Sequence, residues 1–312
     1  MAEAPRGPRV FDGRAVLALL AVQVCFAVFP VLGKIAMREI PPFVVAAFRA
    51  VVGAVLLTAA ARLLEPGGPR LERRDHVKLA GLSLIGIVAN QILYINGLAR
   101  TTATNTTLLT ATVPVFTLVL ALFVRAERPS FRRILGVPMA LAGVLLLLNL
   151  KAMHLGDATL TGDLLVAVNS IFYAAFLVGS REILSRHSAI VVTASVFRWA
   201  AAPILLLAIP DLLRFRPGDV HAGSWLALAG IGLFPTLLAY FLNAWALSRT
   251  SPSTTAVFIY VQPLIAMSLA FLVLGERPGP RTAVAAVLIF VGIALTTIPG
   301  RPVSRSEGVP GP

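Results

Sequence analysis

Long apolar runs are the feature of this sequence that most restricts its fold. A helix needs about 20 apolar residues to cross the hydrocarbon core of a bilayer, and runs of this kind follow one another through almost the whole chain. We place them at residues 15–37, 42–63, 77–98, 103–124, 131–149, 160–181, 190–209, 223–247, 253–273 and 280–299. Because a chain inside lipid must satisfy its own backbone hydrogen bonds, the pattern predicts an all-α integral membrane protein with ten transmembrane helices.

The composition agrees with a membrane protein. Hydrophobic residues make up 57% of the 312 residues and charged residues only 13%, whereas a soluble domain carries about 25% charged residues. The net charge of +13 would suit a nucleic-acid partner. The Lys and Arg residues, however, are concentrated in the short segments between apolar runs, as on a membrane surface. We therefore expect the lipid bilayer as a partner and no nucleic acid.

The basic residues also predict an orientation. With the N-terminus in the cytoplasm, 17 of the 27 Lys and Arg residues fall in predicted cytoplasmic segments and 8 in predicted external ones. Cytoplasmic loops carry the excess in membrane proteins, so both termini are predicted to be cytoplasmic. Residues 1–14 and 300–312 are then short cytoplasmic tails.

The chain repeats itself after 149 residues. Without a gap, Phe48-Arg49 aligns with Phe197-Arg198, Arg100-Thr101 with Arg249-Thr250, Pro114 with Pro263, and Glu127-Arg128-Pro129 with Glu276-Arg277-Pro278. These matches predict two five-helix repeats, 15–149 and 160–299. Five is an odd number, so the halves insert with opposite orientation. Inverted repeats of this kind place a binding site near the midplane, between the halves.

Polar helix starts and mid-span prolines occur in both halves. Seven of the twelve residues from Thr101 to Thr112 are threonine, and Pro114 follows; the equivalent tract, 249–265, contains Pro263. Proline removes a backbone hydrogen bond, and irregular backbone at membrane depth is tolerated where it lines a cavity. We expect both prolines to kink helices beside a cavity. Local bonding of the hydroxyls to their own helix is the alternative for the threonines.

Two stretches carry a family resemblance. "NGLARTTATNTTLLTATVPVF" followed by "RAERPS", and "ALSRTSPSTTAVFIYVQPLIA" followed by "LGERPGP", resemble the signature halves of EamA-type transporters of the drug/metabolite transporter superfamily. The opening "FAVFPVLGKIAMREIPPFVVAAFR" is similar too, but Phe26-Ala27 stand where that family has a Trp-Gly pair. The resemblance implies ten helices and outward transport of small metabolites, often amino acids.

Charged side chains are rare within the predicted spans. All 14 acidic residues and all four histidines lie in loops, tails or span ends, so the sequence offers no intramembrane proton relay. Arg49 and Arg198 lie about 10–12 Å into their spans, and Lys34 and Arg181 lie nearer the span ends. Each is a candidate gate or anion contact; the alternative is that each extends to the interface or bonds helix-end carbonyls.

Uncharged polar side chains mark the predicted solute pathway. Amide and aromatic residues recur three or four positions apart in three spans, so each pair shares a helix face. The predicted pathway residues are Gln23, Asn90, Tyr94, Asn169, Tyr173, Tyr240, Asn243, Tyr260 and Gln262. Together they suit a pocket for a zwitterionic or amphipathic small-molecule solute, although hydrogen bonding between helices explains any one of them.

Other chemistry has little support. Cys25 is the one cysteine, no metal-ligand cluster stands out, and no Gly-rich phosphate loop is present, so we expect no metal, cofactor or ATP. No Ser/His/Asp set can lie deep in the bundle. We predict a secondary transporter that exports small metabolites across a bacterial inner membrane by alternating access. An integral membrane enzyme and a non-transporting membrane scaffold are the alternatives.

Overall fold

The computed structural model describes residues 12–66, 71–101, 103–147, 157–265 and 280–297. Every regular element within these ranges is a helix, so the predicted all-α fold is confirmed. Most of both predicted tails, the end of the span 253–273 and the Glu276-Arg277-Pro278 motif lie outside the described residues.

The first half contains five helical spans. They are α1 (Gly13–Ala36), α2 (Pro42–Leu64), the series α3 (Arg73–Ser83), η1 (Leu84–Ala89) and α4 (Asn90–Arg100), the pair α5 (Ala103–Thr110) and α6 (Val113–Phe123), and α7 (Phe131–Leu147). The sequence sets several boundaries directly. Asp12 caps α1 by accepting a hydrogen bond from the Arg14 N–H, and Pro42 occupies the first turn of α2, where a missing N–H costs nothing.

The second half follows the same order. It contains α8 (Asp157–Leu184), α9 (Ala189–Arg214), the short η3 (Pro217–Asp219), the series α10 (Ala222–Ile231), η4 (Gly232–Leu238) and α11 (Ala239–Leu247), then α12 (Pro252–Val257), η5 (Phe258–Val261) and helical residues 262–265, and finally α14 (Pro280–Thr297). Some helices are longer than the apolar runs of the sequence. For example, α9 continues past residue 209, the end of its predicted span, to Arg214.

Six of the described helices are long and apolar enough to cross a membrane. They are Gly13–Ala36, Pro42–Leu64, Arg73–Arg100, Leu160–Leu184, Ala189–Arg214 and Ala222–Leu247; Val113–Phe123 and Ala283–Thr297 are shorter apolar helices. The shorter length of α6 follows from the interruption of its span next to Pro114. These elements make the chain a multi-pass membrane protein.

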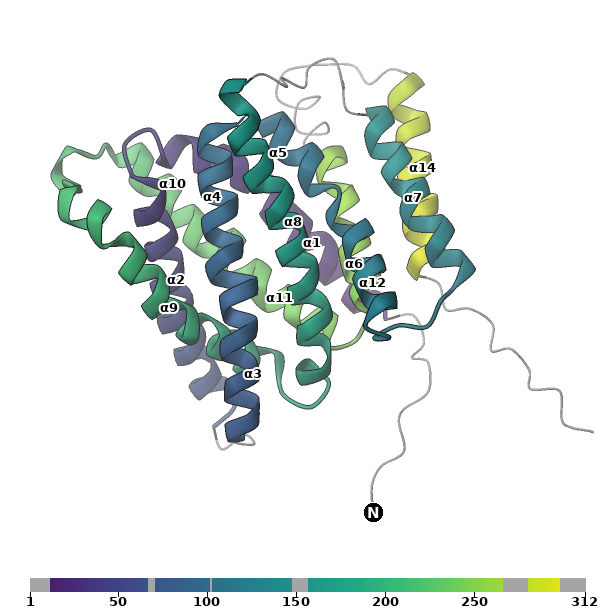
Figure 1. Cartoon of the computed structure of the whole chain (residues 1–312), viewed down its shortest axis with the longest axis horizontal. Helices are drawn as coiled ribbons and strands as arrows, with labels where there is room; N and C mark the ends of the chain where they lie inside the picture. Colours follow the sequence, from purple (N-terminus) through teal and green to yellow (C-terminus); the bar gives the residue numbers. More distant parts are fainter. Residues whose placement is uncertain (1–11, 67–70, 102, 148–156, 266–279, 298–312) are drawn as a thin grey trace, which may run out of the picture.

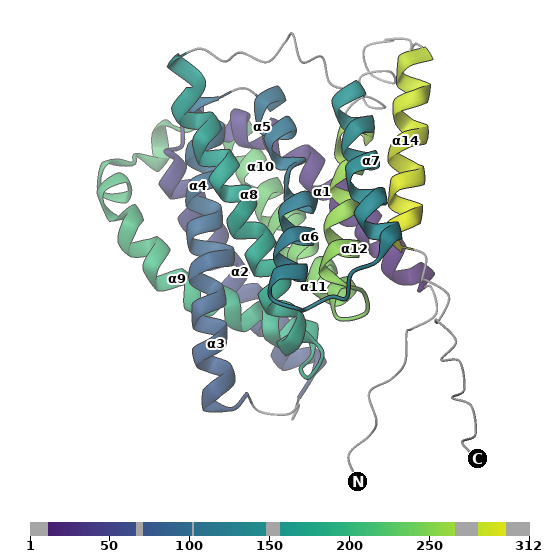
Figure 2. The ribbon, with the colours of Figure 1, turned by 45° about the vertical axis from the view of Figure 1, so that its right-hand side comes forward.

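The two halves pack with a repeated set of contacts. α2 runs along α9, and α7 runs along α14 (Figures 1 and 2). α1 packs against α10 and α11, while α8, its equivalent, packs against η1 and α4. Under the 149-residue repeat, α2 is equivalent to α9 and α7 to α14, so each of these two pairs maps onto itself. The contacts of α1 map onto those of α8. This agrees with the predicted two-repeat architecture.

Irregular helical turns also occur at matched positions. The π-helical turn η1 covers Leu84–Ala89, and η4 covers Gly232–Leu238. The fourth span is interrupted at residues 111–112, and the ninth narrows into the 3-10 turn η5 at the equivalent depth. Pro114 lies in the first turn of α6 after this break, and Pro263 lies in the helical residues directly after η5. Each proline therefore begins a new helical piece, where its missing N–H is tolerated.

Candidate functional site

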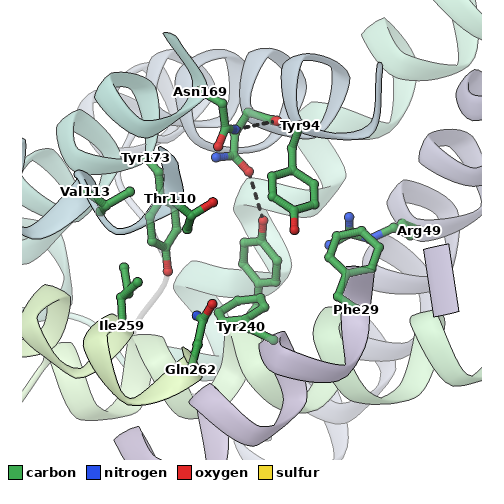
Figure 3. A pocket seen from close by; sticks show the side chains of 12 residues that line it. Phe29, Arg49, Tyr94, Thr110, Val113, Asn169, Tyr173, Tyr240, Ile259 and Gln262 are labelled. Atoms are coloured by element: carbon green, nitrogen blue, oxygen red, sulfur yellow. Dashed lines mark hydrogen bonds between the residues drawn. The ribbon is translucent and has the colours of Figure 1, made fainter. Parts of the chain in front are cut away.

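A central cavity lies where both halves meet, with about 560 Å³ of space that no protein atom fills, part of it open to solvent. Its walls come from α1, α2, α4, α5, α6, α8, α11, η5 and the turn after η5 (Figure 3). The lining residues are Phe26, Phe29, Arg49, Asn90, Tyr94, Thr110, Val113, Asn169, Tyr173, Tyr240, Ile259 and Gln262. Six of the nine predicted pathway residues are among them.

The other three pathway residues lie behind the wall. Gln23 accepts a hydrogen bond of 2.8 Å from the Gln262 side chain, and Asn243 donates to the Tyr173 hydroxyl at 3.3 Å. Tyr260 is fully buried within an apolar cluster. Gln23 and Asn243 therefore orient groups that reach the cavity, whereas Tyr260 packs away from it.

Amide side chains join the cavity wall across the halves. Asn169 Nδ2 on α8 donates to the backbone carbonyl of Asn90 on α4 at 2.8 Å. The Tyr240 hydroxyl on α11 donates to Asn90 Oδ1 at 3.4 Å, and Figure 3 shows both bonds as dashed lines. Asn90 begins α4 directly after the π-helical turn η1. The irregular turn therefore presents Asn90 to partners from the second half.

Aromatic rings form much of the remaining wall. Phe29 and Tyr94 stack with ring centroids 5.2 Å apart, and Phe26 meets Tyr240 edge to face at 6.2 Å. Four lining residues carry no distinguishing sequence signal, because apolar residues and threonines occur throughout these spans: Phe29, Thr110, Val113 and Ile259. Phe26 stood out only as the replacement for a tryptophan. Stacked and edge-on rings suit a ligand with a flat apolar body.

Arg49 reaches the cavity from α2. Its side chain is buried, with 2% of the residue exposed. Nε donates to Thr236 Oγ1 at 2.9 Å and Nη2 to the Pro235 carbonyl at 3.4 Å. The guanidinium carbon lies 4.3 Å from the centroid of the Phe29 ring, within the range of a cation–π contact. The π-helical turn η4 supplies both oxygen acceptors.

Arg198 does not mirror this arrangement. Its side chain is exposed on α9 and donates to Ser195 Oγ, one turn away, at 3.0 Å. The residues equivalent to Pro235 and Thr236 are Gly86 and Ile87. Ile87 offers no hydroxyl, and the Phe176 ring fills the space beside Gly86, only 2.0 Å from where a Cβ would lie. In this structure the two arginines therefore have different surroundings, because the position beside Arg198 lacks the acceptors and the space that η4 offers Arg49.

Lys34 and Arg181 do form an equivalent pair of contacts. Lys34 Nζ donates to the Thr101 carbonyl at 2.9 Å, and Arg181 Nε donates to the Thr250 carbonyl at 2.7 Å. Thr101 and Thr250 are related by the 149-residue repeat. Thr101 directly follows the end of α4, and Thr250 lies three residues after the end of α11. Both cations thus bond backbone carbonyls at span ends, a contact that does not require a gate role.

The start of the threonine tract has a partner of its own. Thr101 Oγ1 donates to Asp163 at 2.5 Å, and Asn105 Nδ2 donates to both Asp163 oxygens at 3.0 and 3.1 Å. Asp163 is buried. These bonds fix α5 against α8, so part of the polar tract secures a helix junction.

Ion pairs join the halves at both ends of the bundle. At the lower end in Figure 1, Asp75 at the start of α3 accepts from His187 at 2.8 Å and pairs with Arg186 at 3.3 Å. At the other end, Glu39 pairs with His221 and accepts its backbone N–H at 3.0 Å. Hydrogen bonds from Ser224 and His221 lower the pKa of the Glu39 carboxyl below its ordinary value.

Within the described ranges, no three His, Cys, Asp or Glu side chains lie close enough together to hold a metal ion. Cys25 is buried as a free thiol in α1.

Comparisons with known proteins decide the family. The profile described as "EamA-like transporter family" matches residues 13–149 and again 160–298. The chain belongs to this family. An "Uncharacterized transporter" of Archaeoglobus fulgidus is 28% identical to this EamA-like protein over 270 residues, covering 85% of this chain and 90% of the relative.

Two further relatives extend the comparison. A protein of Streptantibioticus cattleyicolor named "Probable terminal-alkyne amino-acid exporter" is 27% identical over 249 residues, covering 79% of this chain and 81% of the relative. A solved structure titled "Crystal structure of protein" superimposes with a TM-score of 0.74 at 22% identity, covering 93% of this chain and 99% of that one. The EamA-like chain is thus a membrane transporter by family, and the solved structure shares its fold.

Proposed function

We propose that this EamA-like protein is a secondary transporter that exports small metabolites by alternating access, with the cavity of Figure 3 as the solute site. One observation carries the proposal: amide and phenol groups from both halves, together with the Arg49 guanidinium of the first half, converge on the central cavity. In transporters built from inverted repeats, the solute site lies at this interface, and the halves move around it.

The contacts at the two ends of the bundle support the movement. Asp75 with His187 ties the halves at one end, and Glu39 with His221 ties them at the other. Opening the cavity to one side requires only one of these sets to separate. The Glu39–His221 pair is open to water, and exposed pairs are worth little, about 0–1 kcal/mol, so solute binding can shift the balance at that end.

The solutes that we propose are amino acids and related amphipathic molecules. The cavity combines flat aromatic walls with amide groups, a combination that holds an apolar body and orients a polar end. The relative named an amino-acid exporter supports the same class. Lys34 and Arg181 would hold span ends during the movement, since each bonds a helix-end carbonyl.

The membrane that we propose is a bacterial inner membrane, with both termini in the cytoplasm. The excess of basic residues in the segments on the side of the termini supports this orientation. An enzyme or a scaffold is less well supported, because relatives are named as transporters and the cavity lining offers no nucleophile with an adjacent base.

Solute flux tests the proposal. Purified protein is reconstituted into sealed proteoliposomes, and uptake of radiolabelled amino acids and related amphipathic metabolites is measured against protein-free vesicles. Saturable flux that falls when Asn90 and Tyr240 are replaced by Ala and Phe supports a transporter that uses this cavity. Binding without flux for every solute that binds supports a scaffold or receptor instead.

A further inference from the structure

The cavity holds a buried positive charge without a negative partner. Arg49 is 2% exposed, and its contacts are a threonine hydroxyl, a backbone carbonyl and an aromatic ring. Tyr94 and Tyr240 are the ionisable side chains that interact with it, and phenols are neutral near neutral pH. A buried charge without a counter-ion is costly, so an anionic ligand beside Arg49 would offset this cost.

The rest of the lining does not offset the charge. Among the described residues that line the cavity, Arg49 is the one charged side chain, and none is Asp or Glu. The other lining groups are five aromatic rings, three amides, one hydroxyl and two aliphatic side chains. Without an anionic ligand, the described lining of the site therefore has a net charge of +1.

From this charge balance we infer that the preferred ligand is an organic monoanion, with one carboxylate, a flat apolar body and no free ammonium group. The inference rests on the proposed function and narrows its solute class to the related amphipathic anions, in preference to the zwitterionic amino acids. A carboxylate can form charge-assisted hydrogen bonds with the guanidinium, and it brings the net charge of the site to zero. The apolar body then lies against the rings of Phe26, Phe29 and Tyr240.

A zwitterion fits this site less well. Its ammonium group has no Asp or Glu to pair with among the described lining residues, and two of the oxygens there, the Asn90 carbonyl and Asn90 Oδ1, already accept from Asn169 and Tyr240. The Gln23 oxygen accepts from Gln262, and the Phe29 ring lies over Arg49. An amine cation fits worse still, because it meets Arg49 at short range in a medium of low dielectric constant.

Four matched compounds test the inference on the full-length protein. 3-Phenylpropanoate is phenylalanine without its ammonium group, 2-phenylethylamine is phenylalanine without its carboxylate, and 3-phenylpropanamide is the neutral analogue. Binding of all four, phenylalanine included, is measured by titration calorimetry near neutral pH in lipid nanodiscs. We expect 3-phenylpropanoate to bind at least about tenfold more tightly than the other three, the ratio that one charge-assisted hydrogen bond provides.

Variants assign the preference to Arg49. In Arg49→Gln, 3-phenylpropanoate and 3-phenylpropanamide should bind equally, whereas Arg49→Lys should keep the preference for the carboxylate. Arg198→Gln is the matched control, since its side chain is exposed on α9, and it should leave all four affinities unchanged. The order of affinities in the unmodified protein tests the inference even if an Arg49 variant does not fold.

Three results would overturn the inference. They are phenylalanine binding as tightly as 3-phenylpropanoate, no binding by any of the four compounds, and an unchanged carboxylate-to-amide ratio in a folded Arg49→Gln protein. Flux in proteoliposomes separates this failure from failure of the proposed function. Transport of phenylalanine but not of the carboxylate removes the inference alone; the expected order of binding without any flux removes the transporter proposal alone.

Discussion

Arg49 on α2 and Thr236 on η4 lie 187 positions apart in the chain, yet Arg49 Nε donates a hydrogen bond of 2.9 Å to the threonine hydroxyl. The hydroxyl in turn donates to the Ile231 carbonyl, five residues earlier, at 2.8 Å. A bond across five residues is the spacing of a π-helix. The irregular turn of the second half thus holds in place a buried cation of the first half.

Replacement of Thr236 by Val should destabilise the protein by about 1–3 kcal/mol, because a buried charged donor loses its acceptor. Thermal unfolding in detergent measures the effect as a lower midpoint. Thr193→Val is the matched control, since the Thr193 hydroxyl is also buried but bonds only the Ala189 carbonyl of its own helix. Equal losses in the two variants would mean that the bond to Arg49 contributes nothing.

The two repeat-related arginines should differ in their effect on transport. Arg49→Ala removes a cation from the cavity wall and should reduce flux at least about tenfold, the effect of losing one charge-assisted hydrogen bond. Arg198→Ala removes an exposed side chain and should leave flux within about twofold, since surface changes usually alter little. Flux assays on equal amounts of folded protein compare them. A similar loss in both variants would restore the symmetric role expected from the repeat.

The sequence predicted the helices well, because the thickness of the bilayer fixes the length of an apolar run and the need for internal backbone hydrogen bonds makes such a run helical. It could not predict the breaks before Pro114 and Pro263 in detail, since proline is compatible with a kink or a new helix start. The different positions of Arg49 and Arg198 depend on their neighbours in space. The sequence shows that the position equivalent to Thr236 in the first repeat is Ile87. The effect of this difference on the arginines depends on the packing of η4 against α2.

The cavity lining was predictable where polar side chains were involved. Asn90, Tyr94 and Asn169 are polar residues within apolar helices, so their residue types alone predict contact with a cavity or with another helix. The types of Phe29 and Ile259 do not predict a cavity position, because apolar side chains are equally compatible with lipid contact, the protein core and a cavity wall. Tyr260 shows the converse: a polar aromatic residue at the right depth packs into the apolar cluster.

The contact between α7 and α14 should depend on glycine. A Cβ at Gly143 would lie 2.8 Å from the Ala285 carbonyl oxygen on the facing helix, closer than such contacts allow. Gly143→Ala should therefore lower stability by about 1–3 kcal/mol, as overpacking does. Gly81→Ala on α3 is the control, since nothing lies within 4 Å of its Cβ position, and it should be neutral or stabilising. Unchanged thermal midpoints in both variants would contradict close packing here.

The proposed orientation can be read from fused reporters. Basic residues are concentrated on the side of the termini, so a reporter fused after Lys151 should read as external and one after Arg186 as cytoplasmic. Paired alkaline phosphatase and fluorescent-protein fusions provide the two readouts. The reverse pattern at both sites would invert the orientation.

The central claim is that the cavity between the halves opens to each side of the membrane in turn. Thr110 lines this cavity, and Thr117 lies two turns further along the same span, fully buried and outside the lining. Each is replaced by Cys in a Cys25→Ala background, and a membrane-impermeant thiol reagent is applied to oriented vesicles from either side, with and without solute. We predict that Thr110→Cys reacts from both sides and is protected by solute, while Thr117→Cys reacts from neither. Reaction of Thr110→Cys from one side only, or equal rates with and without a transported solute, would contradict alternating access around this cavity.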